Sequence, residues 1–445
     1  MLSLRKWAAA LVGATMLATG QTPARDRLVI IASIDGFSMQ MLKDPNTSVP
    51  TVRRLMSEGV FASEGMRSVN PTVTWPNHTA MVTGVEPLRH GLLYNGLPVR
   101  APGRAVRIEP FVPKDKLVLA PTLYDLAHSA GLKTAEVDWV AIEDAPTIDY
   151  SFFEIPKAGT PVVREMVQAG LITDEQVRNF TKLSINVRDD FWTEAAIYIL
   201  RKHRPNLLLF HMLTTDSVQH RYGTGALAAQ TALAFADRQL GRLLDAVREM
   251  GIADRTTVFV VSDHGFHSAT KIIRPNTVLK REGLLRSATD CDAWVIPEGG
   301  TAMVYITNPA RRAELLPKLR ESLGALEGVE SVIGEERYAE LGYPPPGPDS
   351  RMSDLVLAAK RGYAFGGDQD GAAVVDVPAG SLSGNHGYLS TMPDMTAIFV
   401  AAGAGIRKGA ALGAIPNLDV GPTAARLLGL EMKGVKGQVL TEILR

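Results

Sequence analysis

Short apolar runs typical of buried strands alternate with segments of helical periodicity along most of this chain. Strands are expected at 28–34, 134–140, 206–212, 256–262 and 396–401, and helices at 49–58, 122–130, 227–250 and 420–428. Two parallel strands need a crossover connection, and a helix commonly provides it, so this order favours a mostly parallel central sheet sandwiched by helices. The sequence therefore predicts an α/β protein with one large domain at 21–445.

The pattern of expected strands and helices changes between about 268 and 384. Strands are expected there at 302–307 and 355–359, a helix at 311–323, and a proline-rich turn at 344–348. No linker separates this stretch from its flanks, and the core pattern resumes after it. We interpret 268–384 as a cap inserted into the domain.

The first twenty residues have the pattern of a secretory signal peptide. Arg5 and Lys6 precede an apolar run at 7–17, and the small residues Ala18 and Gly20 follow. The alternatives are an uncleaved membrane anchor and an ordinary buried helix. A signal peptide at 1–20 predicts a periplasmic or secreted protein that keeps no stable membrane anchor after cleavage, because no later stretch holds eighteen consecutive apolar residues.

The charge balance argues against a nucleic-acid partner, and the cysteine content excludes a disulfide within the chain. Lys plus Arg and Asp plus Glu both total 47, so the formal net charge is zero and no nucleic-acid-binding patch is expected. Cys291 is the one cysteine, so no intramolecular disulfide can form, and we interpret it as structural or incidental. The oligomeric state cannot be inferred from these features.

Acidic and histidine side chains follow several of the expected strands. They are Asp35 after 28–34, Asp216 and His220 after 206–212, Asp263 and His264 after 256–262, and His386 in a glycine-flanked loop. The carboxyl ends of parallel strands meet at one edge of a sheet, so these groups are expected to converge there. Converging carboxylates need cations, and oxygen plus imidazole ligands suit zinc, with other divalent metals as alternatives.

Thr74 is the candidate nucleophile. It precedes a segment at 79–83 with helical character, so its hydroxyl is expected at a helix N-terminus that favours anions. The alternative is a plain helix-capping threonine. A bound zinc ion would favour the nucleophile, because coordination lowers the pKa of a hydroxyl group.

These residues, in their order, resemble one known family. The matching stretches are Asp35, Thr74-Trp75-Pro76-Asn77-His78, Val82-Thr83-Gly84, His90-Gly91, Asn95, Asp216 with His220, Ser262-Asp263-His264-Gly265 and His386-Gly387. The pattern resembles the nucleotide pyrophosphatase/phosphodiesterase (type I phosphodiesterase) branch of the alkaline phosphatase superfamily, over nearly the whole chain after residue 20. An alkaline phosphatase-like fold is then expected.

The resemblance also implies roles for the matched residues. One zinc would be bound by Asp216, His220 and His386, and a second by Asp35, Asp263, His264 and the Thr74 oxygen. Asn95 would contact a phosphate oxygen, and Thr74 would form a phosphothreonine intermediate during ester hydrolysis. His78 and His90 are expected to be structural hydrogen-bonding residues, while His211 and His267 receive no role.

The charge balance of the expected site favours a phosphodiester substrate. Two zinc ions and three aspartates leave a mildly positive site, which suits a diester monoanion. Relatives that cleave monoesters or phosphonoacetate have a basic residue near 134–141, whereas this chain has none after Lys133. The diesterase branch has an aromatic residue there, which Trp139 resembles, although Val140 and Ala141 depart from its usual Pro-Gly. Trp75 could stack on a nucleobase, or form only an apolar wall.

The sequence also allows three alternatives to a phosphodiesterase acting on nucleotide-like esters. A phosphonoacetate hydrolase or a phosphomonoesterase of the same superfamily would fit the spacing of the motifs. A non-catalytic exported metal-binding protein would be expected to lack a ligand or Thr74, and none is missing. Sulfatase chemistry is disfavoured because Cys291 lies outside any matching motif.

Overall fold

A computed structural model describes residues 23–378 and 384–445, so the expected signal peptide at 1–20 lies outside the described residues. The core is a seven-stranded sheet. Its strands, in spatial order, are β2 (Val60–Phe61), β21 (Phe399–Gly403), β9 (Thr256–Val261), β1 (Leu28–Ile34), β8 (Leu207–Met212), β6 (Thr134–Val137) and β7 (Tyr150–Phe152). The five strands from β9 to β7 are parallel, while β21 and β2 pair antiparallel.

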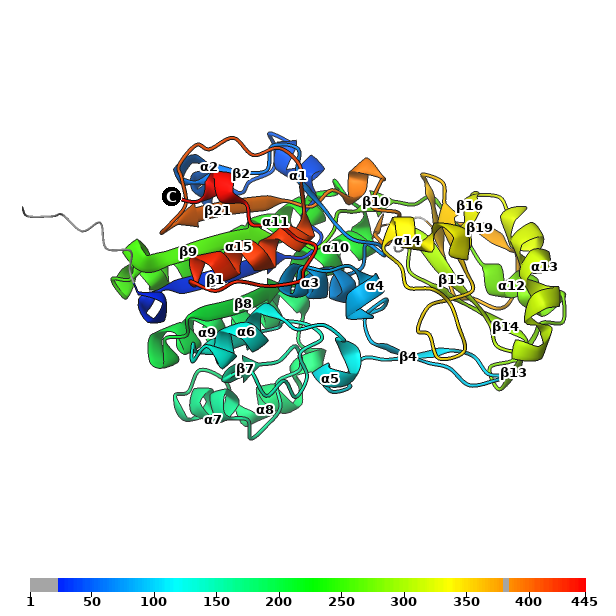
Figure 1. Cartoon of the computed structure of the whole chain (residues 1–445), viewed down its shortest axis with the longest axis horizontal. Coiled ribbons are helices and arrows are strands. Elements are labelled where there is room, and N and C mark those ends of the chain that lie inside the picture. Colours follow the sequence, from blue (N-terminus) through cyan, green and yellow to red (C-terminus); the bar gives the residue numbers. More distant parts are fainter. Residues whose placement is uncertain (1–22, 379–383) are drawn as a thin grey trace, which may run out of the picture.

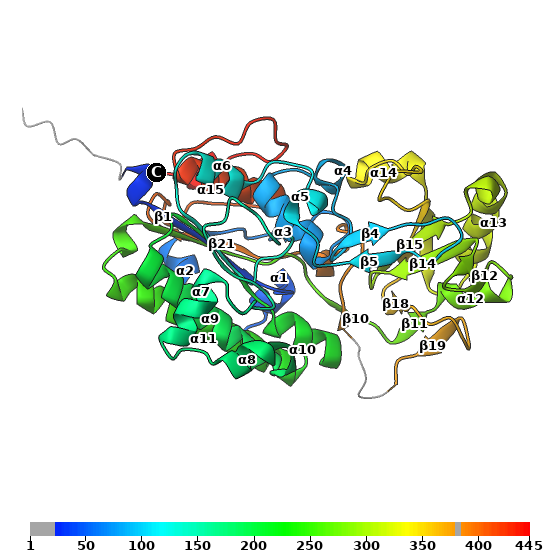
Figure 2. The same cartoon turned by 90° about the horizontal axis from the view of Figure 1, so that it is seen from below.

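Helices cover both faces of this sheet (Figures 1 and 2). One face packs against α2 (Pro50–Glu58), α7 (Pro161–Gln168), α9 (Ile185–His203) and α11 (Leu227–Glu249). The other packs against α3 (Thr74–Thr83), α6 (Leu123–Ser129) and α15 (Val420–Leu427). Strands β1, β8 and β9 are buried along their whole length, which explains their nearly continuous apolar sequences. The expected α/β class with a mostly parallel sheet is confirmed.

Two expected strands have different bounds, each for a local reason. The strand expected at 134–140 ends at Val137, because Asp138 adopts a φ of 57° and leaves the extended conformation. The strand expected at 396–401 begins at Phe399, because a 3-10 turn at Pro393–Met395 precedes it. The other expected core elements agree to within two residues at either end.

A second unit lies to one side of the central sheet (Figure 1). It contains an antiparallel sheet in the order β14 (Ala293–Pro297), β15 (Thr301–Ile306), β17 (Leu355–Ala359) and β16 (Val329–Ile333), covered by α12 (Pro275–Arg281) and α13 (Arg312–Gly324). A small sheet adds β18 (Tyr363–Phe365), β11 (Lys271–Ile273) and β19 (Val374–Asp376). We retain 268–384 as the proposed extent of the cap.

Shorter elements complete the described chain. They are α1 (Met39–Lys43), α4 (Pro87–His90), α5 (Lys114–Leu117), α8 (Asp174–Arg178), α10 (Thr214–Tyr222), α14 (Tyr338–Leu341), β3 (Met66–Arg67), β4 (Leu97–Val99), β5 (Arg107–Glu109), β10 (His267–Ser268), β12 (Leu285–Ser287), β13 (Asp290–Cys291), β20 (Gly384–Asn385) and β22 (Ile415–Pro416). Within 23–378 and 384–445, no helix has both the length and the apolar character needed to cross a bilayer.

Candidate active site

Three of the candidate ligands meet where β1 and β9 end. Asp35 directly follows β1. Asp263 and His264 follow β9, with Ser262 between the strand end and Asp263. All three side chains are fully buried. Nε2 of His264 lies 3.1 Å from Oδ2 of Asp263 and 3.5 Å from Oδ1 of Asp35. The parallel pairing of β1 and β9 thus places one imidazole against two carboxylates.

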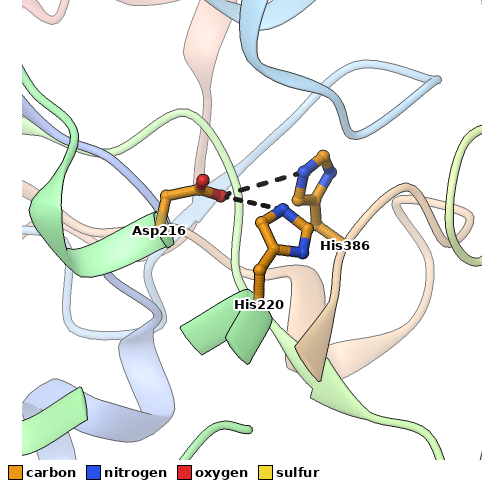
Figure 3. Close-up of side chains that lie close together, drawn as sticks. All are labelled: Asp216, His220 and His386. Carbon is orange, nitrogen blue, oxygen red and sulfur yellow. Dashed lines mark ion pairs between the residues drawn. The ribbon is translucent and has the colours of Figure 1, made fainter. Parts of the chain in front are cut away.

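The other three candidate ligands form a second group, shown in Figure 3. Asp216 and His220 lie one turn apart on α10, and Oδ1 of Asp216 is 3.3 Å from Nε2 of His220. His386 follows β20, and its Nε2 is 3.8 Å from the same oxygen. A Cβ at Gly384 would lie only 2.1 Å from the carbonyl oxygen of Gln219, so glycine lets β20 pack closely against α10.

The two groups adjoin each other. The rings of His264 and His386 stack with 3.9 Å between their centroids. Burial, together with the neighbouring Asp263 and Asp216, raises the pKa of Asp35 well above its usual value. Such crowding of buried carboxylates is unfavourable unless cations compensate it.

The hydrogen bonds of these six side chains fit metal ligation. Each imidazole has its Nδ1 close to a backbone carbonyl oxygen, which leaves Nε2 to present a lone pair. These pairs are His220 with Gly384 at 3.0 Å, His264 with Gly265 at 3.1 Å and His386 with Thr72 at 3.0 Å. Each aspartate also has one buried oxygen without a hydrogen-bond partner, namely Oδ1 of Asp35, Oδ1 of Asp216 and Oδ2 of Asp263. The donor set therefore suits two divalent cations such as zinc.

Burial also favours the neutral form of two of the imidazoles. It lowers the pKa of His264 to about 4 and that of His386 well below its usual value. Only a neutral imidazole can bind a metal, so both residues are suited to this role near neutral pH.

Thr74 lies beside the first group, at the start of α3. Its Oγ1 is 3.4 Å from Nε2 of His264. Val73, not Thr74, occupies the N-cap position of the helix, so the alternative of a helix-capping threonine does not hold. The N–H of Thr74 belongs to the first turn, where amides have no intrahelical acceptor. Helix α3 therefore presents both a hydroxyl and a positive dipole end toward the candidate ligands.

The remaining predicted site residues surround the start of α3. Oδ1 of Asn95 accepts a hydrogen bond of 2.9 Å from the backbone N–H of Trp75. Trp75 and Trp139 are both buried, and both line a cavity of about 250 Å³ that Leu117 and Phe153 also line. Asn95 thus contacts Trp75, the residue that follows the candidate nucleophile, and Trp75 shares a cavity with Trp139.

The remaining histidines of the matched motifs make hydrogen bonds, and His78 contacts Thr74. Nδ1 of His78 lies 2.9 Å from the carbonyl oxygen of Thr74, and its Nε2 lies 2.9 Å from Oγ of Ser33. His90 accepts a hydrogen bond at Nδ1 from the backbone N–H of Leu92. His267, which lies outside both ligand groups, pairs with Asp394 at 2.7 Å.

The sequence interpretation missed His211 and Asp138. The imidazole of His211 lies between Asp35 and Asp138. Burial alone would lower the pKa of His211, but these two carboxylates raise it well above its usual value. The signal was present in the sequence, because His211 is the one polar residue inside the apolar strand β8.

The orientation of α10 depends on a carboxylate from the preceding helix. The carboxylate of Asp189, on α9, accepts hydrogen bonds from the backbone N–H groups of Leu213 at 2.9 Å and Thr214 at 3.1 Å. It therefore caps the start of the helix that carries Asp216 and His220.

Comparison with known proteins identifies the family. The family model described as type I phosphodiesterase / nucleotide pyrophosphatase matches residues 29–389. Ectonucleotide pyrophosphatase/phosphodiesterase family member 3 of Bos taurus is 25% identical over 241 residues, which cover 53% of this chain but only 24% of that protein. This chain thus matches about a quarter of the length of that relative. The bis(5'-adenosyl)-triphosphatase of Xenopus laevis is 22% identical over 408 residues, covering 90% of this chain and 78% of that protein.

Solved structures agree in fold. Human ectonucleotide pyrophosphatase/phosphodiesterase 5 superposes with a TM-score of 0.70 at 19% identity, covering 94% of this chain and 100% of that one. An inactive variant of the murine protein in complex with AMP superposes with a TM-score of 0.67 at 20% identity, with the same coverage. The chain belongs to the type I phosphodiesterase/nucleotide pyrophosphatase family of the alkaline phosphatase superfamily.

Proposed function

We propose that this protein is a hydrolase of nucleotide-like phosphate diesters that uses Thr74 as its nucleophile beside two zinc ions. The observation that carries the proposal is the convergence of six ligand-competent side chains next to the Thr74 hydroxyl. Asp216, His220 and His386 would hold one ion, and Asp35, Asp263 and His264 the other. When bound, the ions would lower the pKa of the hydroxyl and neutralise phosphate charge.

The protein groups would position the reaction. Oγ1 of Thr74 gives up its proton to solvent and attacks phosphorus in line with the leaving group. An O–P bond forms while the ester bond to the leaving group breaks, and the departing oxygen takes up a proton from water. The resulting phosphothreonine is then hydrolysed by water, which regenerates the hydroxyl. The N–H of Thr74 at the start of α3 and the side-chain amide of Asn95 would donate to phosphate oxygens.

The cavity that Trp75 lines supports a nucleotide-like substrate. Trp75 and Trp139 offer flat apolar surfaces for a base. Among the described residues that line the cavity, Lys157 is the one basic side chain, and it pairs with Glu143. A cavity without an unpaired cation suits the single negative charge of a diester better than the two charges of a monoester. The AMP complex of the murine relative agrees with a nucleotide ligand.

A substrate panel tests this proposal. Zinc-loaded protein should cleave a nitrophenyl ester of thymidine monophosphate faster than nitrophenyl phosphate or phosphonoacetate. Dominant cleavage of nitrophenyl phosphate or of phosphonoacetate would identify a phosphomonoesterase or a phosphonoacetate hydrolase instead. A protein that binds two metal ions and leaves every ester intact would be the non-catalytic metal-binding alternative.

Export to the periplasm or beyond the cell is part of the same proposal, and it rests on the pattern at 1–20. The mass of the protein recovered from each cell fraction tests it. Export predicts a chain shortened by about twenty residues outside the cytoplasm. Full-length protein confined to the cytoplasm would contradict it.

A further inference from the structure

His211 occupies a buried position between two carboxylates. It lies on β8, opposite Ser33 of β1, with only 1% of its surface exposed. Its Nε2 is 3.0 Å from Oδ2 of Asp35. Its Nδ1 is 3.2 Å from Oδ2 of Asp138 and 3.0 Å from the carbonyl oxygen of the same residue. Both ring nitrogens therefore face oxygen acceptors, one of which belongs to a candidate zinc ligand.

The backbone of Asp138 is shaped for this contact. Its φ of 57° ends β6 at Val137 and lies in the left-handed region, which aspartate tolerates better than most residues. The side chain is fully buried, and its carboxylate accepts no hydrogen bond apart from its ion pair with His211. A buried carboxylate in an unusual backbone conformation needs a compensating interaction, and His211 supplies it.

The contact with His211 leaves the two oxygens of the Asp35 carboxylate in different surroundings. Its Oδ2 is occupied by His211, whereas its Oδ1 has no hydrogen-bond partner and lies 3.5 Å from Nε2 of His264. We propose that Asp138 and His211 form a positioning pair, which fixes the Asp35 carboxylate so that Oδ1 remains directed at the zinc ion. This inference rests on the proposed function, because it takes Asp35 to be a zinc ligand.

The segment after β6, which carries Asp138, also forms a wall of the proposed substrate cavity. Trp139 follows Asp138, and its backbone N–H donates to Oε2 of Glu136 at 3.1 Å. The indole of Trp139 meets the ring of His78 edge-on at 4.7 Å, and His78 meets His211 at 4.6 Å. The positioning pair is thereby packed between the metal ligands and the cavity.

Two amide variants at residue 211 separate the two hydrogen bonds. The amide nitrogen of His211→Gln can take the place of Nε2 and still donate to Asp35. The amide nitrogen of His211→Asn takes the place of Nδ1, so it can reach Asp138 but not Asp35. Outer hydrogen-bond partners of metal ligands typically contribute about 10- to 100-fold to metal affinity. We therefore expect His211→Asn to lose about 10- to 100-fold in affinity for one zinc, and His211→Gln to lose severalfold at most.

The measurement is zinc affinity by competition with a chelating dye, together with zinc content per chain. His203→Gln is the matched control, because Nε2 of His203 also pairs with a carboxylate, Oε2 of Glu165, at 2.7 Å. His203 ends α9, before β8 begins, and so lies away from the carboxyl ends of the strands. The His203→Gln variant should bind zinc with the affinity of the wild-type protein.

Equal zinc affinity in the Asn and Gln variants, whether retained or lost, would overturn the inference. A wild-type protein that binds no zinc would instead contradict the proposed function. Asp138→Asn, which keeps a residue tolerant of positive φ, provides an independent test should neither variant at 211 fold. It should weaken one zinc site severalfold, and an unchanged affinity would overturn the positioning role.

Discussion

Oγ1 of Thr74 lies 3.4 Å from Nε2 of His264, although the two residues are 190 positions apart in the chain. The contact joins the first turn of α3 to the loop after β9. It places a hydroxyl group at the edge of a cluster of candidate metal ligands, where a bound cation would acidify it.

This contact predicts the behaviour of variants at Thr74. Thr74→Ala should reduce kcat by at least about a thousandfold, because no other group can replace the attacking oxygen. The variant should still bind two zinc ions, since the six other ligands remain. Thr74→Ser should retain measurable turnover. Kinetics with metal analysis test this.

Thr83→Ala is the matched control for that experiment. Thr83 ends the same helix, is also buried, and donates its hydroxyl to the carbonyl oxygen of Thr79 at 2.7 Å. Its loss should leave kcat near the wild-type value. Turnover in Thr74→Ala at the rate of this control would refute the assignment of the nucleophile.

Removal of one imidazole should empty one of the two zinc sites. His220→Ala leaves Asp216 and His386 as the only ligands in their group, so zinc content should fall from about two ions per chain to about one. His128→Ala, which breaks a partly exposed pair with Asp149 at 3.3 Å, should keep both ions. Zinc analysis after gel filtration measures this, and two retained ions in His220→Ala would contradict the ligand assignment.

Loss of the cap on α10 should affect both stability and metal binding. Asp189→Ala removes the acceptor for two backbone N–H groups at the start of α10, which should lower the free energy of unfolding by about 1 to 2 kcal/mol. It should also weaken the zinc site of Asp216 and His220, because the helix that carries them loses its anchor. Chemical denaturation and zinc titration measure the two effects.

Asp237 provides a control of the same geometry. From α11 it caps α2, accepting from the N–H groups of Thr51 at 2.9 Å and Val52 at 2.8 Å. Asp237→Ala should lower stability by a similar amount and leave zinc affinity unchanged. Equal loss of zinc affinity in both variants would show that the Asp189 effect is not local to α10.

A buried glutamate should make stability depend on pH. Burial raises the pKa of Glu136 to about 8 from an ordinary value of 4.5. The folded protein therefore binds more protons than the unfolded chain between these values, and the free energy of unfolding falls as pH rises through that interval. The contribution is at most about 1.4 kcal/mol per pH unit.

Glu136→Gln removes this titration and keeps an oxygen that accepts from the N–H of Trp139. Its unfolding free energy should vary less between pH 5 and about 8 than that of the wild type, in denaturation curves at several pH values. Glu249→Gln, which changes an exposed residue paired with Arg201, should follow the wild-type curve. Parallel curves for Glu136→Gln and the wild type would contradict the prediction.

The sequence by itself determined the α/β class and the chemical character of the site. Apolar runs such as 28–34 and 256–262, rich in β-branched residues, favour buried strands, and acidic or imidazole groups follow both. Parallel strands end at one edge, so the convergence of Asp35 and Asp263 on that edge could be predicted from the sequence. The spacing of Asp216 and His220 likewise follows from one helical turn.

Only the tertiary structure decided which groups touch across elements. The position of His386 depends on the pairing of β20 with β10, and that of α10 on a cap from Asp189. The contact of Asp138 with His211 depends on a positive φ and on the neighbouring positions of β6 and β8. The physical reason is that hydrophobic periodicity reports which face of a strand or helix is buried, whereas hydrogen bonds between distant side chains depend on backbone geometry that no local pattern encodes.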